Sequence, residues 1–234
     1  MKKIYVFFLT LLIVITSITH SYANTITSKG TGINGLWNQT NSWAGGMQPG
    51  NSDTVEILDG DTITVNVASL QVNKITINGP TGKLIVNHDF QVYYDFIVGL
   101  DATLEVANTI YITIGGFYNN GTVIGSASAL IWVKDNDLVN NGTIDGSLLQ
   151  LYIGSGPNGK HHAINGSGFI GSLGSPIYFI SVYDSLDINL GPGDSIYTSN
   201  LALYAGVLKN SQKIVLGDGN TASVRMGFPI GQNP

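Results

Sequence analysis

A short acidic segment is the first candidate for a chemical function in this sequence. Asp135 and Asp137 flank Asn136, so two carboxylates and an amide carbonyl stand close together along the chain. Oxygen ligands of this kind bind Ca²⁺ in protein loops, which makes Asp135 and Asp137 candidate metal ligands. The alternative is a turn without a metal, because Asp is among the residues that turns favour. No other cofactor is expected.

A pair of histidines gives the second candidate. His161 and His162 follow a Gly-rich segment, residues 154–160. Neighbouring side chains of an extended segment point to opposite sides, so the two rings are poorly suited to chelate one metal ion. Insertions into repeat proteins lie in surface loops, often on a binding face. We therefore expect a binding site at this loop, with His161 and His162 as its candidate residues.

Two aromatic residues give the third candidate, a binding surface. Tyr111 and Trp132 alternate with the apolar residues Ile110, Ile112 and Val133, and successive residues of a strand point to opposite faces. If the apolar residues face the core, the two rings face outward and can stack on sugar rings. Rings that faced inward would fill the core instead.

Catalytic chemistry has less support. Enzymatic cleavage of acidic polysaccharides needs a cation close to a cluster of carboxylates, with Arg or Lys as the base. Arg225 is the only Arg and has no evident partner, and Lys134, beside Asp135, is the remaining candidate base. We therefore expect a non-catalytic module, with a polysaccharide lyase or glycoside hydrolase as the alternative.

An internal repeat indicates the elements that must position these residues. Residues 110–125 (IYITIGGFYNNGTVIG) align without a gap with residues 131–146 (IWVKDNDLVNNGTIDG), and related turns recur at steps of 19 to 24 residues. Repeats of about 20 residues with Gly/Asn turns are typical of a β-solenoid. The predicted fold is all-β, a right-handed parallel β-helix of about 20-residue coils with an N-terminal cap. An antiparallel sandwich or jelly roll is the alternative.

The repeated Asn-Asn-Gly-Thr turn predicts how the coils stack. Asn120 and Asn141 should form a ladder of amide hydrogen bonds, as identical polar residues do in stacked strands. Gly121 and Gly142 are expected to take the positive φ of a tight turn. Both Asn residues also head N-x-[ST] sequons, so glycan attachment is the alternative role.

The N-terminus indicates export. Lys2 and Lys3 precede an apolar run, and residues 21–23 (SYA) match a cleavage site, which is typical of a signal peptide over residues 1–23. The run is too short for a membrane span, which needs about 20 apolar residues, so no span is expected after cleavage. With a net charge of −5 and no basic cluster, the chain is not expected to bind nucleic acid.

The N-terminal part also resembles a known family. Residues 35–37 (GLW), 42–46 (SWAGG), Pro49 and 53–57 (DTVEI) are similar to the opening of secreted bacterial right-handed β-helix surface proteins with a G8-like motif, GxW…SWxGG…P…DxVxI. The resemblance implies secretion or a place on the outer surface of a Gram-negative bacterium. It also implies an adhesin-like or scaffold role, with glycans or other surface proteins as partners. No sorting domain of that family is recognisable at the C-terminus, so we expect a part of a longer protein or a short relative.

The two Trp of that motif have a predicted structural role. The first coil of a solenoid exposes unpaired edges and an open apolar core, and Trp37 and Trp43 are expected to cover it. Exposed rings that bind sugars are the alternative. We accordingly divide the chain into a signal peptide (1–23), a short linker (24–34), an N-terminal cap with the first coil (35–60) and β-helix coils (61–234).

Overall fold

The computed structural model describes residues 23–126, 129–155, 160–217 and 223–226. Residues 1–22 of the expected signal peptide lie outside the described residues. In the described part, the strands are accompanied only by three short 3₁₀ helices, η1 (Thr40–Ser42), η2 (Ala44–Gly46) and η3 (Ser211–Lys213). None of the described residues forms a helix long and apolar enough to cross a membrane.

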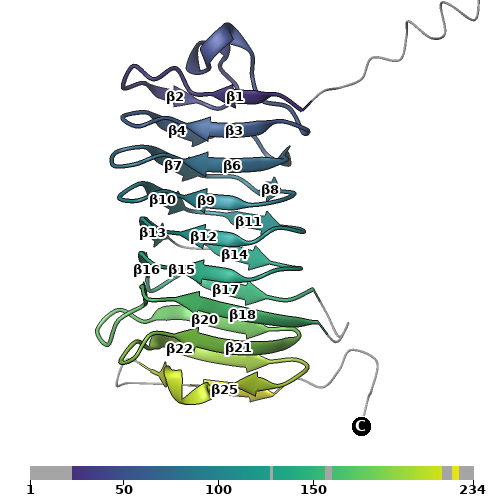
Figure 1. Cartoon of the computed structure of the whole chain (residues 1–234), viewed down its shortest axis with the longest axis vertical. Coiled ribbons are helices and arrows are strands. Elements are labelled where there is room, and N and C mark those ends of the chain that lie inside the picture. The colour runs from purple at the N-terminus through teal and green to yellow at the C-terminus, as the bar shows by residue number, and fades with distance from the viewer. Residues whose placement is uncertain (1–22, 127–128, 156–159, 218–222, 227–234) are drawn as a thin grey trace, which may run out of the picture.

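The strands stack coil upon coil into an elongated body with three faces (Figure 1). Face A is a nine-stranded sheet of β1 (Thr25–Thr27), β3 (Thr54–Ile57), β6 (Lys74–Ile77), β9 (Phe96–Val98), β12 (Phe117–Asn119), β15 (Leu138–Asn140), β18 (His161–Gly166), β21 (Ser185–Leu190) and β23 (Leu208–Lys209).

Faces B and C are the two arms of one sixteen-stranded sheet, and they meet in the long strand β22 (Ile196–Leu203). Face B holds β2 (Asn34–Leu36), β4 (Thr62–Val65), β7 (Lys83–Val86), β10 (Thr103–Val106), β13 (Thr122–Gly125), β16 (Thr143–Asp145) and β19 (Phe169–Ile170). Face C holds β5 (Leu70–Val72), β8 (Phe90–Val92), β11 (Thr109–Ile112), β14 (Leu130–Val133), β17 (Gln150–Ile153) and β20 (Ile177–Val182). Two further strands, β24 (Ile214–Leu216) and β25 (Ser223–Met226), pair with β22.

Pairing is parallel from one coil to the next. On face A, Ile75 pairs with Phe96 and Phe96 with Phe117, and on face C, Ile110 pairs with Ile131. Each of these pairs joins residues 21 positions apart, which is the period read from the sequence. The predicted parallel β-solenoid is therefore confirmed, and the antiparallel sandwich is excluded.

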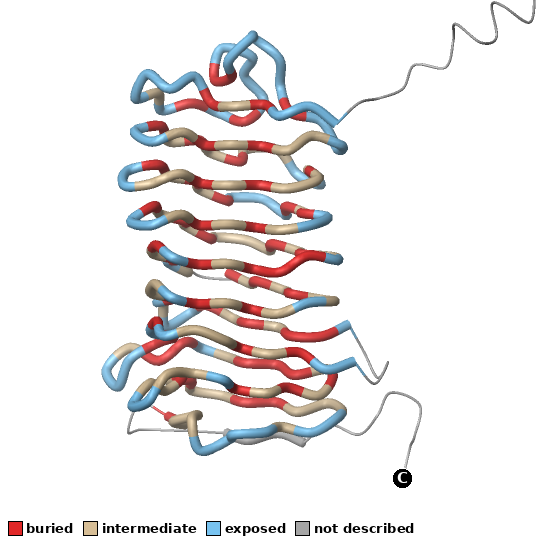
Figure 2. Tube along the Cα trace, in the orientation of Figure 1, coloured by how far each residue is buried: buried red, intermediate tan, exposed pale blue. Residues whose placement is uncertain are grey.

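The core is a continuous column inside the three faces. Strands alternate buried and partly exposed residues, as Figure 2 shows along each coil. Phe90, Phe96 and Phe117 are fully buried, and their rings lie 6.4 Å and 5.5 Å apart in succession. Full burial of such a side chain contributes about 1.5–3 kcal/mol, so stacking supplies a stability that no single coil could reach.

Asparagine ladders connect the turns between faces A and B. The expected ladder exists, because Asn141 Nδ2 donates to Asn120 Oδ1 at 3.0 Å. A second, buried ladder joins Asn119 Nδ2 to Asn140 Oδ1 at 2.7 Å. An unpaired buried amide costs about 1–3 kcal/mol, so this inner ladder holds the two coils in register.

The expected positive φ at Gly121 and Gly142 is wrong, because neither is among the residues with positive φ. Glycine is needed at both positions because the backbones of adjacent turns approach each other closely. A Cβ on Gly142 would overlap Gly121 O and lie 2.8 Å from Gly121 N, and a Cβ on Gly121 would overlap Ala102 O. Glycine therefore allows adjacent turns to pack backbone against backbone.

The N-terminal coil is closed by the two Trp residues. Trp37 is fully buried and Trp43 is 2% exposed, their rings lie 4.9 Å apart edge to face, and Trp43 Nε1 donates to Trp37 O at 2.8 Å. The Trp37 ring also lies 5.3 Å from Phe90 in the core. The burial of both rings supports the predicted structural role, in which Trp37 and Trp43 cover the open end of the core.

Residues 24–34, expected as a linker, take part in the first coil. Strand β1 pairs with β3, and Asp61 accepts hydrogen bonds from Gly30 N at 2.7 Å and Ile33 N at 2.9 Å. Burial by itself raises the pKa of Asp61, but hydrogen bonds from Ser28, Gly30 and Ile33 outweigh it and hold the pKa below its ordinary value. The ionised carboxylate therefore fastens this segment to the solenoid.

Candidate functional site

Face C carries the two aromatic residues singled out by the sequence. Tyr111 on β11 pairs in register with Trp132 on β14, and their ring centroids lie 5.8 Å apart. Both residues are partly exposed, whereas Ile110, Ile112 and Val133 between them are buried. The two rings therefore stand on the outer side of the strands, as the alternation favoured.

The rings continue along face C into a larger group, which we call the aromatic strip. Its members are all partly exposed aromatic residues of face C or of the strand ends beside it: Tyr111, Trp132, Tyr152, Phe179, Tyr183 and Tyr204. Tyr152 pairs with Trp132 in register. Tyr183 stacks on Trp132 with centroids 5.8 Å apart and on Tyr204 at 4.8 Å with 9° between the planes.

The structure adds Tyr152, Phe179, Tyr183 and Tyr204 to the two rings that the sequence singled out. A signal for Tyr204 was present, because it follows Tyr183 by 21 residues, which is the coil period. Phe179 pairs with Gln150, and no aromatic precedes it at the repeat distance. Its ring, 6.3 Å from that of Tyr152, joins the strip only through the fold.

Packing and hydrogen bonds hold the rings of the strip in place. Trp132 Nε1 donates to Gly154 O at 2.7 Å, and Tyr152 Oη donates to Gln150 Oε1 at 3.2 Å. Ser181, which pairs with Tyr152, is fully buried although its neighbours Ile180 and Val182 face the core. Because Ser181 therefore points outward, the rings around it must cover it, and the strip is a pre-formed surface.

Two phenols of the strip, Tyr152 and Tyr183, are held in the neutral form. Burial raises the pKa of Tyr152 and of Tyr183, because the charged phenolate is poorly solvated between other rings. The cation that faces the strip is Lys134, whose Nζ lies 5.1 Å from the centroid of Tyr111 and 4.9 Å from that of Trp132.

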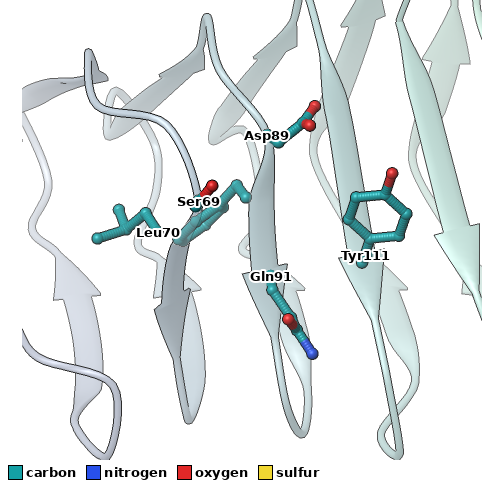
Figure 3. Close-up of a pocket in the computed structure, with 6 residues that line it drawn as sticks. Ser69, Leu70, Asp89, Gln91 and Tyr111 are labelled. Atoms are coloured by element: carbon teal, nitrogen blue, oxygen red, sulfur yellow. The ribbon is translucent and has the colours of Figure 1, made fainter.

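A hollow of about 200 Å³ adjoins the strip where it ends at Tyr111. It is lined by Ser69, Leu70, Asp89, Phe90, Gln91 and Tyr111. Figure 3 shows Leu70, Gln91 and Tyr111 on successive strands of face C, with Ser69 and Asp89 directly before β5 and β8. Gln91 is oriented by a hydrogen bond from its Nε2 to Thr113 Oγ1 at 3.0 Å. The hollow thus places a hydroxyl, a carboxylate and an amide beside an aromatic ring.

The carboxylates expected to bind Ca²⁺ have partners from the protein. Asp137 Oδ1 accepts from Ala163 N at 2.7 Å. Asp135 accepts from Ser155 Oγ at 3.0 Å and forms an ion pair with Lys160 at 3.0 Å. The hydrogen bond from Lys160 holds the pKa of Asp135 below its ordinary value. Both side chains tie the ends of the insertion to the coil before it.

No metal site accompanies these carboxylates in the described part of the chain, where no group of three or more His, Cys, Asp and Glu is arranged to hold an ion. Calcium coordination takes six or more oxygen ligands. In this arrangement Asp135 and Asp137 contact protein groups, and Ca²⁺ binding at them stays a prediction.

The two histidines point to opposite sides, as expected for an extended segment. His162 is 3% exposed, and its Nδ1 donates to Asn136 O at 2.9 Å, since a carbonyl can only accept. Its Nε2 lies 3.5 Å from Asp184 Oδ2. His161 is exposed and lines a second hollow, of about 230 Å³, with Asp187 and Lys209. His161 and His162 therefore do not form one site. Residues 156–159, which precede them in the expected binding loop, lie outside the described residues.

The residues considered for catalysis do not converge where the structure describes them. Lys134 faces the rings of Tyr111 and Trp132, while its neighbour Asp135 pairs with Lys160. The side chain of Arg225 lies outside the described residues. The aromatic strip is therefore the surface feature with the clearest chemical character.

Comparison with protein-family models, with curated proteins and with solved structures gives no match to this chain. The interpretation of the site thus depends on its geometry.

Proposed function

We propose that the chain is an exported, non-catalytic β-solenoid module that binds carbohydrate through the aromatic strip. The observation that carries the proposal is the continuity of the strip, in which partly exposed rings follow one another from β11 to β22 on a rigid sheet. The apolar faces of sugar rings pack against aromatic rings, whose bodies are apolar and whose polar tips stay in water.

The length of the strip favours an oligosaccharide over a single sugar. The rings lie on β11, β14 and β17 and on or directly after β20 and β22, which are neighbours in that order. Strands lie about 4.8 Å apart, so the four steps from β11 to β22 span about 19 Å. A chain of several sugars can contact successive rings. Once the first sugar is bound, each further contact forms within the same complex and increases the affinity.

The hollow beside Tyr111 supplies the polar groups that a sugar site also needs. Binding sites combine apolar walls with a few placed polar groups. Here the Tyr111 ring forms a wall, while Ser69, Asp89 and Gln91 offer hydrogen-bond partners for sugar hydroxyls. The hollow therefore suits one end of the bound chain.

Export and a surface role complete the proposal. They follow from the signal-peptide pattern of residues 1–23 and from the resemblance of the N-terminal segment to secreted surface proteins. A stiff parallel stack is a suitable scaffold, because it can hold a binding face at a distance from the site of attachment. Glycans on another cell or in the surrounding matrix are the proposed partners.

The test is a glycan array with residues 24–234, followed by titration of the best ligand against Tyr111→Ala and Trp132→Ala. We expect each variant to bind roughly tenfold more weakly, which is about 1.4 kcal/mol per lost ring contact. Tyr118→Ala is the matched control, because Tyr118 is a partly exposed ring on face A. Circular dichroism of each variant checks the fold. Equal affinity of all three variants, or binding to no glycan, would contradict the proposal.

A further inference from the structure

A single cation lies against the aromatic strip among the residues described. Lys134 directly follows β14, and its Nζ is close to 5 Å from two ring centroids, at 5.1 Å for Tyr111 and 4.9 Å for Trp132. The lysines that form ion pairs in the described part of the chain are Lys74, Lys83 and Lys160. Lys134 is not among them, and its Nζ lies over two ring faces instead.

Two carboxylates of the neighbouring turns are engaged elsewhere. Asp135 is bound by Lys160 and Ser155. Asp184 is buried beside His162, with both side chains 1% exposed. The middle of the strip therefore presents the ammonium group of Lys134 beside aromatic rings.

We propose that the strip selects acidic polysaccharides, with a uronic acid seated at Tyr111 and Trp132 and its carboxylate next to Lys134. This inference rests on the proposed carbohydrate binding and specifies its ligand class. Lys134 lies over the faces of Tyr111 and Trp132, and Tyr183 is stacked on Trp132, so a pyranose ring packs against the outer edges of the two rings and directs its exocyclic carboxylate toward the ammonium group. The ammonium group beside both rings then donates to that carboxylate and forms an ion pair with it.

The charge pattern of face C also gives the ligand a direction. Asp89 precedes β8 and lines the hollow at one end of the strip, whereas Lys134 follows β14, two coils further on. A carboxylate repels an anionic sugar and accepts hydrogen bonds from a neutral one. The acidic sugar is therefore placed at Lys134, and a neutral part of the chain faces the hollow.

The experiment compares each polymer with its own neutral form. Linear polygalacturonate, polymannuronate and polyglucuronate are tested by calorimetry and by affinity electrophoresis, each beside the same polymer after carboxyl reduction. Reduction removes the charge and keeps the linkage, so the affinity ratio isolates the ion pair. We expect residues 24–234 to bind at least one acidic form on the order of fivefold more tightly than its reduced form at low salt. The preference should shrink as salt is added.

Variants at Lys134 assign the preference to that side chain. Lys134→Gln should bring the ratio of the affinities for the acidic and the reduced polymer close to one. Lys134→Arg should preserve the wild-type ratio. Lys29→Gln is the control, because Lys29 is an exposed lysine in the first coil and its loss changes the net charge equally. An unchanged ratio in Lys134→Gln, or equal binding of acidic and reduced forms by the wild type, would overturn the inference while leaving carbohydrate binding in place. If no glycan of any kind binds, the proposed function fails and the inference fails with it.

Discussion

Gly142→Ala is the most direct test of how the coils stack. A Cβ at this position would overlap Gly121 O in the preceding coil and lie 2.8 Å from Gly121 N and 2.9 Å from Asn120 C. Ordinary contacts between heavy atoms are about 3.5–4.0 Å, so the two turns must separate by about 1 Å or more. Gly121 O also accepts the hydrogen bond from Thr143 N at 2.8 Å. The methyl group therefore strains a rung of the ladder as well as the packing.

Overpacking of this kind costs about 1–3 kcal/mol, and each kcal/mol lowers the melting temperature of a domain of this size by about 2–4 °C. We expect a decrease of about 2–12 °C in the thermal midpoint, followed by circular dichroism. Faster hydrogen exchange at the Thr143 amide should accompany it, because that bond is the one displaced.

Gly174→Ala is the matched control for this substitution. A Cβ at Gly174 would have no heavy atom within 4 Å, and this glycine does not have positive φ, so its replacement should leave the midpoint unchanged or slightly raised. Equal midpoints for Gly142→Ala, Gly174→Ala and the wild type would refute the close-packing explanation for the repeated glycine.

Two further predictions concern the first coil. Trp37→Ala should lower the free energy of unfolding by about 3–5 kcal/mol, because it opens a cavity against Phe90, whereas Met47→Ala, at a 58% exposed position, should be close to neutral in the same denaturant titration. Asp61→Asn should flatten the acid dependence of stability. The folded-state pKa of Asp61 is lowered from 3.8, so its ionisation stabilises the fold above about pH 3.8, and that contribution is lost as pH falls through the lower folded-state pKa. An acid titration with the same slope in wild type and Asp61→Asn would contradict this role.

Several features of the protein could be predicted from the sequence because they are local or periodic. A 21-residue repeat and two-residue alternation suffice to predict parallel coils, an inward row such as Ile110 and Ile131, and the register of Tyr111 with Trp132. The ladder between Asn120 and Asn141 follows from the same period. Identical residues one coil apart must meet when the coils stack.

Other features depended on how the insertion alters that period. Leu138 pairs with Ile164, so the step across the insertion is 26 residues, and the 21-residue period read upstream does not predict the register there. Only the folded chain could therefore bring Phe179 into the aromatic strip and give Asp137 a partner in Ala163.

The solenoid could thus be read from the chain alone, because hydrophobic alternation and repeat length are properties of each coil. Three features emerge only in the folded molecule: the close approach that requires Gly142, the partners of Asp135, and the position of Lys134 over two rings. These depend on side chains and backbone atoms that come from different coils. Their distances are set by stacking, which no single stretch of sequence encodes.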